Sequence, residues 1–428
     1  MFGDRLIAFA EALLKGLLFD CHRCGQCVLS STALICPMTC PKGLRNGPCG
    51  GTMDGKCEVK PESRCVWVRI RERTRQGATR LPPLFPSADS SLAGTSSYLN
   101  ALAGRDRAGR EALAYPNLGE RRTEQPSHTP SVLEKRLKNG VFARMCEVRA
   151  PRTMDFSDLR GQASEIVGHF DAVNVTAYLS GKPSLPSALV AARLAAMGIE
   201  PVAQATGRDH TKTSFIAELM SNHVNGVPNV LCVTGDAYAG RPCSKQVYDM
   251  DSSLMLYEAR MLRETGVIHF TGDPLPDPPR PFLGAAINPF SSPEWVPLVR
   301  LKQKAACGAD FIQTQLVFDI DRFSRFMEAV RAQGLDRELF IIAGIPVITS
   351  RKALAVLPTV PGVHIPGVVL RRLDCSRGIK REGVELAREI ASAVSAIPGV
   401  AGVHLMLFGP DHSVLPDVVR GLRDRRES

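Results

Sequence analysis

The sequence predicts a (β/α)8 TIM barrel preceded by a small cysteine-rich metal-binding domain and a long linker. The chain has 428 residues, which suits a barrel of about 250 residues together with a smaller unit. Eight of the 13 cysteines lie before residue 66. From Ser131 onward, apolar runs rich in β-branched residues alternate with helical patterns. We therefore expect the cysteine-rich domain over residues 1–75, a linker or extended arm over 76–130 and the barrel over 131–428.

The barrel prediction depends on eight candidate strands with helices between them. The strands are the apolar runs Val141–Val148, Ala172–Thr176, Glu200–Thr206, Asn229–Gly235, Phe282–Asn288, Phe311–Val317, Leu339–Val347 and Gly402–Gly409. Helical patterns separate them at Asp158–His169, Ser187–Met197, Thr213–Asn222, Ser252–Glu264, Glu294–Cys307, Asp321–Gln333 and Gly383–Ala396. Such alternation predicts parallel strands with right-handed crossovers. Eight repeats favour a closed barrel over an open sheet, and no Gly-x-Gly-x-x-Gly motif follows the first strand.

Polar residues end most of these strands. They include Glu147, Thr176, the run from Thr206 to Asp209, Asp236, Asn288 and Gln315. In barrels of this type the chemistry takes place at the carboxyl ends of the strands. One polar turn would carry no meaning, but the repetition predicts a functional site at this end of the barrel.

Composition limits the classes of partner. The net charge is +10, yet the basic residues do not form a stripe interleaved with aromatic residues, so we do not expect nucleic-acid binding. A polyanionic small substrate would account for the surplus equally well. No run of about 20 apolar residues is present, so no membrane span is expected. The first 20 residues lack the features of a signal peptide, and we expect a cytoplasmic protein.

The cysteines of the first domain predict metal binding. In a chain without a secretory signal, a cluster of this kind favours metal ligands over disulfides. Thiolates on short loops suit tetrahedral four-sulfur sites for iron–sulfur clusters or for zinc, and eight cysteines could form two such sites. The candidate ligands are Cys21, Cys24, Cys27, Cys36, Cys40, Cys49, Cys57 and Cys65.

Several stretches of the barrel region resemble methylenetetrahydrofolate reductases. They are NVLCVTGD (229–236), GAAINPF (284–290), DFIQTQLVFD (310–319), AGIPV (343–347) and GVAGVHLMLFG (399–409), and their order and spacing match the family from about Leu133 to Leu422. The resemblance implies an oxidoreductase of one-carbon metabolism that holds a flavin, FAD or alternatively FMN, across the top of the barrel. A tetrahydrofolate substrate would stack on the flavin. NADH or a protein electron donor would supply electrons, and the chain would form a homo-oligomer.

The resemblance also implies roles for individual residues. Glu147 matches the general acid of the family, and Asp236 matches the aspartate beside the flavin ring. Gln315 matches the glutamine that binds the pterin. The positions that match cofactor-binding segments are Thr176, Gln204, Thr206, Arg208, Asp209, Gly235, Asn288, Lys304 and Ala309. For Ala309, a packing role is the preferred interpretation.

Four positions depart from the family pattern. They are Arg149 near the acid, Ala177, Thr234 before the glycine–aspartate pair, and Gln303. These departures leave open the flavin affinity, the choice of flavin and the reductant. Two other functions also stay open at this point. The same site could oxidise methyltetrahydrofolate in one-carbon catabolism, or the barrel could be a flavin-free methyltransferase that binds methyltetrahydrofolate.

The cysteine-rich stretch carries a resemblance of its own. Over residues from about 10 to 72 it is similar to the cysteine-rich domain of the partner subunit of reductases from acetyl-CoA-pathway bacteria. That resemblance implies a metal, with a [4Fe–4S] cluster as the first choice and zinc as the alternative. Electron transfer and a purely structural role both remain open, because a domain this small usually needs a metal or disulfide to fold.

Overall fold

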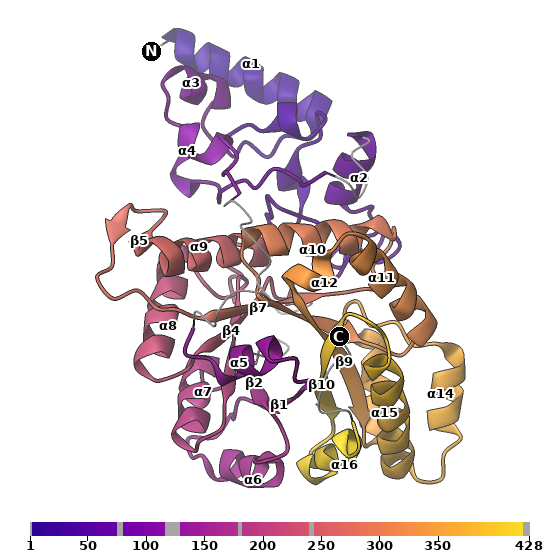
Figure 1. Ribbon diagram of the computed structural model, residues 1–428. Coiled ribbons are helices and arrows are strands. Elements are labelled where there is room, and N and C mark those ends of the chain that lie inside the picture. Colours follow the sequence, from indigo (N-terminus) through magenta and orange to yellow (C-terminus); the bar gives the residue numbers. More distant parts are fainter. Residues whose placement is uncertain (1, 75–79, 116–128, 179–181, 239–243, 423–428) are drawn as a thin grey trace.

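The computed structural model describes residues 2–74, 80–115, 129–178, 182–238 and 244–422. The predicted barrel is present: eight parallel strands close in the order β1-β10-β9-β8-β7-β4-β3-β2 (Figure 1). Each lies within one of the predicted runs or within two residues of it: β1 (Ala143–Arg149), β2 (Ala172–Thr176), β3 (Pro201–Thr206), β4 (Asn229–Val233), β7 (Phe282–Ile287), β8 (Phe311–Leu316), β9 (Phe340–Ile348) and β10 (Val400–Phe408). Residues 76–79 and 116–128 of the predicted arm and residues 423–428 lie outside the described residues.

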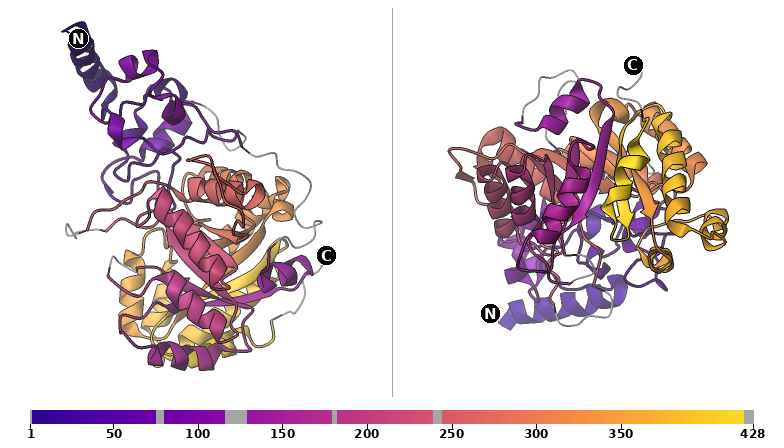
Figure 2. Two further views of the ribbon diagram at one scale, coloured as in Figure 1. Left: turned by 90° about the vertical axis from the view of Figure 1, so that its left-hand side faces the viewer. Right: turned by 90° about the horizontal axis from the view of Figure 1, so that it is seen from below.

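Helices connect consecutive strands and surround the barrel (Figures 1 and 2). They are α6 (Ser157–Ile166), α7 (Ser187–Ala196), α8 (Lys212–Val224), α9 (Ser252–Thr265), α10 (Trp295–Cys307), α11 (Ile320–Ala332), α12 (Leu335–Glu338), α13 (Arg351–Val356), α14 (Gly367–Asp374), α15 (Ile379–Ser395) and α16 (Leu415–Val419). A short hairpin of β5 (Val267–Ile268) and β6 (Asp273–Pro274) follows α9. The start of α9 shows why the helices begin where they do: the Asp251 carboxylate accepts hydrogen bonds from the backbone N–H groups of Ser253 and Leu254.

The barrel interior is closed at the amino ends of its strands. Helix α5 (Val132–Lys138) precedes β1, and its buried Leu133 and Leu137 pack with the side chains at the starts of the strands. Phe282 and Phe311 stack in this layer with ring centroids 5.1 Å apart. Since this end is filled by apolar side chains, an open cavity can form only at the carboxyl ends.

The cysteine-rich module lies against the barrel on its α10 side. It contains α1 (Phe2–Phe19), α2 (Val66–Arg73) and the 3₁₀ turns η1 (Leu29–Ser31) and η2 (Pro37–Thr39), and it projects from one end of the barrel (Figure 2). Trp67 of α2 packs with Val296 of α10 in one buried apolar cluster. Arg300 of α10 donates to the backbone oxygen of Asn46 at 2.6 Å. The contact is therefore both apolar and hydrogen-bonded.

Residues 80–115 pack between the module and the barrel. This segment includes η3 (Ser90–Leu92), α3 (Ser97–Leu102) and α4 (Arg107–Arg110), and its Leu84 and Phe85 are buried. The side chain of Asn46 in the module exchanges two hydrogen bonds with the backbone of Phe85, at 2.7 and 2.8 Å. On the barrel side, Gln303 donates to the Tyr115 hydroxyl at 3.1 Å. The segment thus contacts both units.

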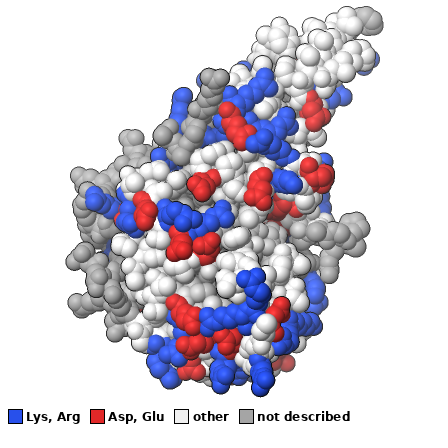
Figure 3. All heavy atoms as spheres, turned by 90° about the vertical axis from the view of Figure 1, so that its right-hand side faces the viewer, with Lys and Arg blue, Asp and Glu red and all other residues white. Residues whose placement is uncertain are grey.

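The molecular surface is mixed in charge. On the face shown in Figure 3, Lys and Arg side chains alternate with Asp and Glu side chains. Arg372 of α14, which binds Glu382 and Glu389 of α15, is an example of such pairing at the surface. Within the described residues, none of the helices is both long enough and apolar enough to cross a bilayer.

Candidate functional site

A cavity of about 620 Å³ opens at the carboxyl ends of the strands, a size typical of cofactor and substrate pockets. Ten of the predicted site residues line it: Glu147, Thr176, Gln204, Thr206, Arg208, Gly235, Asp236, Asn288, Lys304 and Gln315. Two others do not. Asp209 lies behind Arg208, and Ala309 is fully buried in the apolar core around the barrel. The strand ends therefore bring most of the predicted residues together.

Glu147 lies at the end of β1, on the inner side of the cavity. Its carboxylate is 3.9 Å from Nε2 of His404 on the neighbouring strand β10, and the two side chains are 14% and 3% exposed. Burial raises the pKa of Glu147 to about 7, against the opposing effect of Arg149. Burial also lowers the pKa of His404 to about 3. At neutral pH the pair is thus a half-protonated acid beside a neutral imidazole.

Asp236 follows β4 on a loop that turns at Gly235. Gly235 has φ of 85°, and a Cβ there would lie 2.9 Å from Cβ of Arg208, so glycine suits both the turn and the close approach. Asp236 opens onto the cavity. Its pKa is raised, first by removal from water and then by the nearby Glu58 carboxylate, while Lys42 and Arg208 oppose the shift.

Arg208 is held in place by hydrogen bonds. Its guanidinium binds the Asp209 carboxylate at 2.7 and 3.0 Å and donates to the backbone oxygens of Tyr178 and Asp236, each at 3.2 Å. The Tyr238 ring lies 4.2 Å from the guanidinium carbon, and its hydroxyl donates to Asp209 at 2.6 Å. The pairing fixes the guanidinium at the cavity wall and partly offsets its charge.

Two further cavity residues have polar groups that suit a bound cofactor. Lys304 is buried beneath the cavity and donates to the backbone oxygen of Ala286. Burial, and after it Arg300, lowers the pKa of Lys304 to about 7. The buried Thr176 hydroxyl has no hydrogen-bond partner among the described residues, although it lines the cavity.

The pterin-binding position predicted for Gln315 also lies at the cavity. Its amide donates to the backbone oxygen of Pro361 at 3.2 Å, and its oxygen accepts from Leu316 N at 3.0 Å. Deeper in the barrel, Asn174 and Gln313 exchange hydrogen bonds at 2.7 and 3.1 Å. This amide pair and His404 were not predicted as site residues from the sequence. A polar residue within an otherwise apolar strand was the available signal for all three.

The module also contributes to the cavity, which the sequence did not predict. Lys42, Cys49, Gly50, Gly51 and Glu58 line it together with the barrel residues. Asn288 connects the two units, because its amide nitrogen donates to Gly50 O at 3.2 Å and to Gly362 O at 3.0 Å. The site is therefore built by both parts of the chain.

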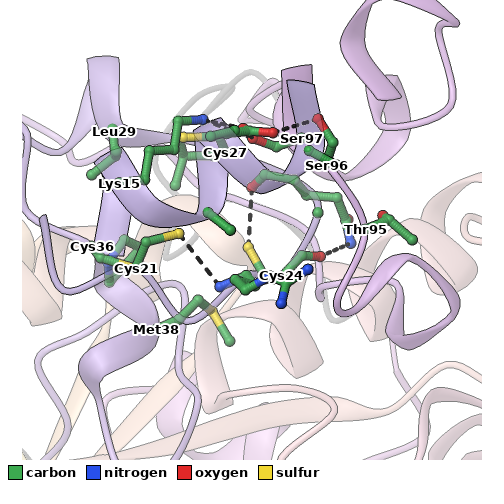
Figure 4. A pocket seen from close by; sticks show the side chains of 18 of the residues that line it. Lys15, Cys21, Cys24, Cys27, Leu29, Cys36, Met38, Thr95, Ser96 and Ser97 are labelled. Carbon is green, nitrogen blue, oxygen red and sulfur yellow. Dashed lines mark hydrogen bonds and ion pairs between the residues drawn. The ribbon is translucent and has the colours of Figure 1, made fainter. Parts of the chain in front are cut away.

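The eight cysteines of the module form two groups. Cys21, Cys24, Cys27 and Cys36 line a cavity of about 30 Å³ beneath α1, together with Lys15 and Arg45 (Figure 4). The other four are Cys40, Cys49, Cys57 and Cys65. Burial raises the pKa of Cys40 to about 11, and its neighbours Cys65 and Cys57 add to the shift.

No disulfide joins the described cysteines. Within the described ranges, no three His, Cys, Asp or Glu side chains are arranged so that they could hold a metal ion as they stand. The structure thus gathers the predicted ligands into two sets of four without bringing them to ligating geometry. Metal binding by the module stays a prediction.

Family models match both parts of the chain. The family model described as "Methylenetetrahydrofolate reductase" matches residues 132–416. A second, described as "Methylene-tetrahydrofolate reductase C terminal", matches residues 3–83.

Several curated relatives match part of the chain. "Methylenetetrahydrofolate reductase (NADH) 1" of Zea mays is 27% identical over 200 residues, which cover 45% of this chain and 32% of that protein. "Methylenetetrahydrofolate reductase 1" of Schizosaccharomyces pombe is 32% identical over 129 residues, 29% of this chain and 21% of that protein. The chain thus spans about a third or less of the length of these relatives.

Among the solved structures that match is one with a TM-score above 0.5. It is an uncharacterized protein from Clostridium thermocellum described as binding two copies of 5-methyl-5,6,7,8-tetrahydrofolic acid. It is 13% identical with a TM-score of 0.51, and the match covers 67% of this chain and 99% of that one. At this identity the likeness concerns the barrel fold alone.

Proposed function

The chain belongs to the methylenetetrahydrofolate reductase family, and we propose that it is a flavin-dependent oxidoreductase that interconverts 5,10-methylenetetrahydrofolate and 5-methyltetrahydrofolate. The observation that carries the proposal is the placement of Glu147 and Asp236 on one cavity at the carboxyl ends of the strands. One of these carboxyl groups has a pKa of about 7 and the other a raised pKa, a combination that suits proton transfer at neutral pH.

The cavity fits a flavin, with FAD as the first choice and FMN as the alternative. Its volume of about 620 Å³ is in the range for such ligands. The unpartnered Thr176 hydroxyl and the Gln204 amide would bind the polar chain of the cofactor, and Arg208 and Lys304 would hold its phosphates. Gly235 allows the backbone to approach the ring closely. Bound flavin would supply the hydride that reduces the methylene carbon.

Glu147 would act as the general acid. Its protonated carboxyl group would give a proton to the folate nitrogen that leaves as the methylene bridge opens, and the hydride would convert the remaining carbon to a methyl group. In the reverse direction the Glu147 carboxylate would take that proton back. A pKa of about 7 leaves both forms populated at neutral pH, so the same residue could serve either direction.

Asp236 and Gln315 would orient the reacting partners. The Asp236 carboxylate disfavours extra negative charge on a ring beside it and stabilises a cationic folate species. The Gln315 amide offers both a donor and an acceptor to the pterin. We propose NADH or a protein electron donor as the source of electrons.

The test is an anaerobic absorption spectrum of the purified chain with FAD, before and after addition of methyltetrahydrofolate. We expect flavin bands that bleach on addition, because oxidation of the methyl group passes its hydride to the flavin. The spectrum of a Glu147→Gln variant should retain the bands and bleach far more slowly. A chain that binds methyltetrahydrofolate but neither FAD nor FMN would contradict the proposal and favour a flavin-free methyltransferase.

We also propose that the module binds metal through its two groups of four cysteines, as [4Fe–4S] clusters or as zinc. Thiolates are the preferred ligands of both, and four sulfurs make a complete tetrahedral site. Cys49, in the second group, lines the barrel cavity, so this group is the one suited to exchange electrons with a flavin.

The metal content of the purified chain distinguishes iron–sulfur clusters from zinc. Anaerobic purification followed by elemental analysis should give about four iron atoms or one zinc per occupied site. The Cys24→Ser variant should lose the metal of the first group only, and Cys49→Ser that of the second only. Wild-type chain free of both iron and zinc after anaerobic purification would refute metal binding.

A further inference from the structure

The module places a buried ion pair in the wall of the barrel cavity. Lys42 and Glu58 form this pair, and their side chains are 3% and 6% exposed. Neither residue belongs to the barrel, yet both line its cavity. Burial of two charges is costly unless further hydrogen bonds satisfy them, so the remaining partners of the pair are informative.

Most of these partners lie on the barrel loop that carries Asp236, apart from the Cys49 thiol of the module, which donates to Oε2 of Glu58 at 3.6 Å. Lys42 Nζ donates to the backbone oxygen of Gly235 at 2.9 Å. The Glu58 carboxylate accepts from the backbone N–H of Ala237 at 3.4 Å. The pair therefore binds the backbone immediately before and immediately after Asp236. The Tyr248 hydroxyl adds a bond to the Gly235 oxygen at 3.3 Å.

Both the barrel loop and the module have a glycine at the point where the backbone meets the Lys42–Glu58 pair. Gly235 is in the left-handed region, at φ of 85°. In the module, a Cβ on Gly51 would lie 1.5 Å from Oε2 of Glu58, so only glycine leaves room for the carboxylate there.

We propose that the Lys42–Glu58 pair is a positioning element of the active site, which fixes the Gly235–Ala237 backbone and thereby the place of the Asp236 carboxylate in the cavity. The module thus completes a site that the barrel alone would leave loose. The fixing of the loop is independent of the proposed function. Only the catalytic importance of Asp236 rests on it. Docking itself has other supports, since Trp67 packs on Val296 and Arg300 binds Asn46 away from the pair.

The experiment compares full-length variants without ligand. Lys42→Met removes the bond to Gly235 but leaves Glu58 unpaired. The double variant Lys42→Met/Glu58→Gln leaves no unpaired charge and keeps the chain foldable. The control is Glu72→Gln, which breaks the Arg64–Glu72 ion pair of the same module. This pair lies at the surface, with the Arg64 and Glu72 side chains 57% and 36% exposed. Hydrogen exchange of the peptide 229–238 reports on the loop, and tryptophan emission reports on docking.

We expect exchange in peptide 229–238 of the double variant to be at least about tenfold faster than in the wild type, with emission and metal content unchanged. The Glu72→Gln control should match the wild type. With FAD bound, kcat of the double variant should fall about tenfold or more while the folate KM changes little, because misplacement weakens the reaction rather than binding.

Two results would overturn the proposal. One is unchanged exchange at 229–238 in the double variant. The other is faster exchange throughout the module–barrel interface with red-shifted tryptophan emission, which would make the pair a docking contact. A wild-type chain that binds no flavin would refute the proposed function instead, and the exchange data would still decide the positioning role.

Discussion

Glu147 and His404 show how one physical cause acts in opposite directions on two neighbouring residues. Removal from water disfavours any charge, so it raises the pKa of the carboxyl group to about 7 and lowers that of the imidazole to about 3. The imidazole, 3.9 Å away, therefore stays neutral and does not hold the carboxyl group in its ionised form at neutral pH. The proposed proton donation by Glu147 would depend on this arrangement.

Replacement of Glu147 by glutamine should lower turnover by about 10²- to 10⁴-fold, the usual contribution of a general acid. In the wild type, kcat for methylene reduction should fall as the pH rises above about 7, because the proton to be donated is then lost from Glu147. Stopped-flow oxidation of reduced flavin across pH 5.5–9 measures this. Glu165→Gln on the exposed part of α6 is the control. A Glu147→Gln variant with wild-type rate and pH profile would show that another group supplies the proton.

Lys304 should make flavin binding dependent on pH. Its pKa is lowered to about 7 in the free protein, and a phosphate beside it would favour the ammonium form. Binding above pH 7 must then take up a proton, close to one per flavin at pH 8, and the affinity must decrease as the pH rises from 7 to 9. Calorimetry in two buffers of different ionisation enthalpy measures the uptake. Lys304→Met should abolish it, and uptake that persists in this variant would contradict the assignment.

At the scale of single elements, the strands were predictable and some helices were not. The strands are short apolar runs buried on both faces, and their β-branched residues mark them clearly. Helices α5 and α14 and the hairpin β5–β6 were not predicted, because segments of two to eight residues are too short to show a period. The strand ends predicted seven of the ten cavity residues, since topology alone brings the carboxyl ends of parallel strands together. The family resemblance supplied the other three, Gln204, Gly235 and Lys304, the last of which lies in helix α10.

Two helical glycines should respond oppositely to alanine. In α15, a Cβ at Gly383 would lie 1.8 Å from the backbone oxygen of Ile348 in β9, so Gly383→Ala must push the helix from the barrel. We expect a loss of about 1–3 kcal/mol in the free energy of unfolding. Gly161 in α6 has no atom within 4 Å of its Cβ position, so Gly161→Ala should add about 0.5–1 kcal/mol. Urea denaturation of both variants measures these changes in the free energy of unfolding. Changes of the same sign and size in the two variants would contradict the prediction.

At the scale of the whole molecule, the sequence did not predict how the module meets the barrel. Lys42 lies between two cysteines and Glu58 directly after one, and nothing in that pattern indicates a partner 193 residues away at Gly235. Contacts of this kind depend on tertiary packing between separate units, which has no local period or motif. The composition of residues 80–115 likewise indicated an arm but not its place between the two units.

Unfolding of the two units should be a single transition. The chain has only two tryptophans, Trp67 and Trp295, and both belong to the apolar cluster at the interface. Since that interface is apolar and hydrogen-bonded, separation of the module and unfolding of the barrel should occur together. Tryptophan emission and far-ultraviolet circular dichroism should give coincident thermal midpoints. An emission change at a clearly lower temperature would show that the module separates first.

The position of the module ahead of its docking surface has a consequence for biosynthesis. Asn46 is made 254 residues before Arg300, the α10 residue that binds it. At a translation rate of about 5–20 residues per second, the cysteines leave the ribosome roughly 10–50 s before that helix exists. During this interval both groups of four thiols are accessible to an assembly factor or to free metal. Later docking would place Cys49 against the barrel, so the order of synthesis would set a time window for the proposed metal binding.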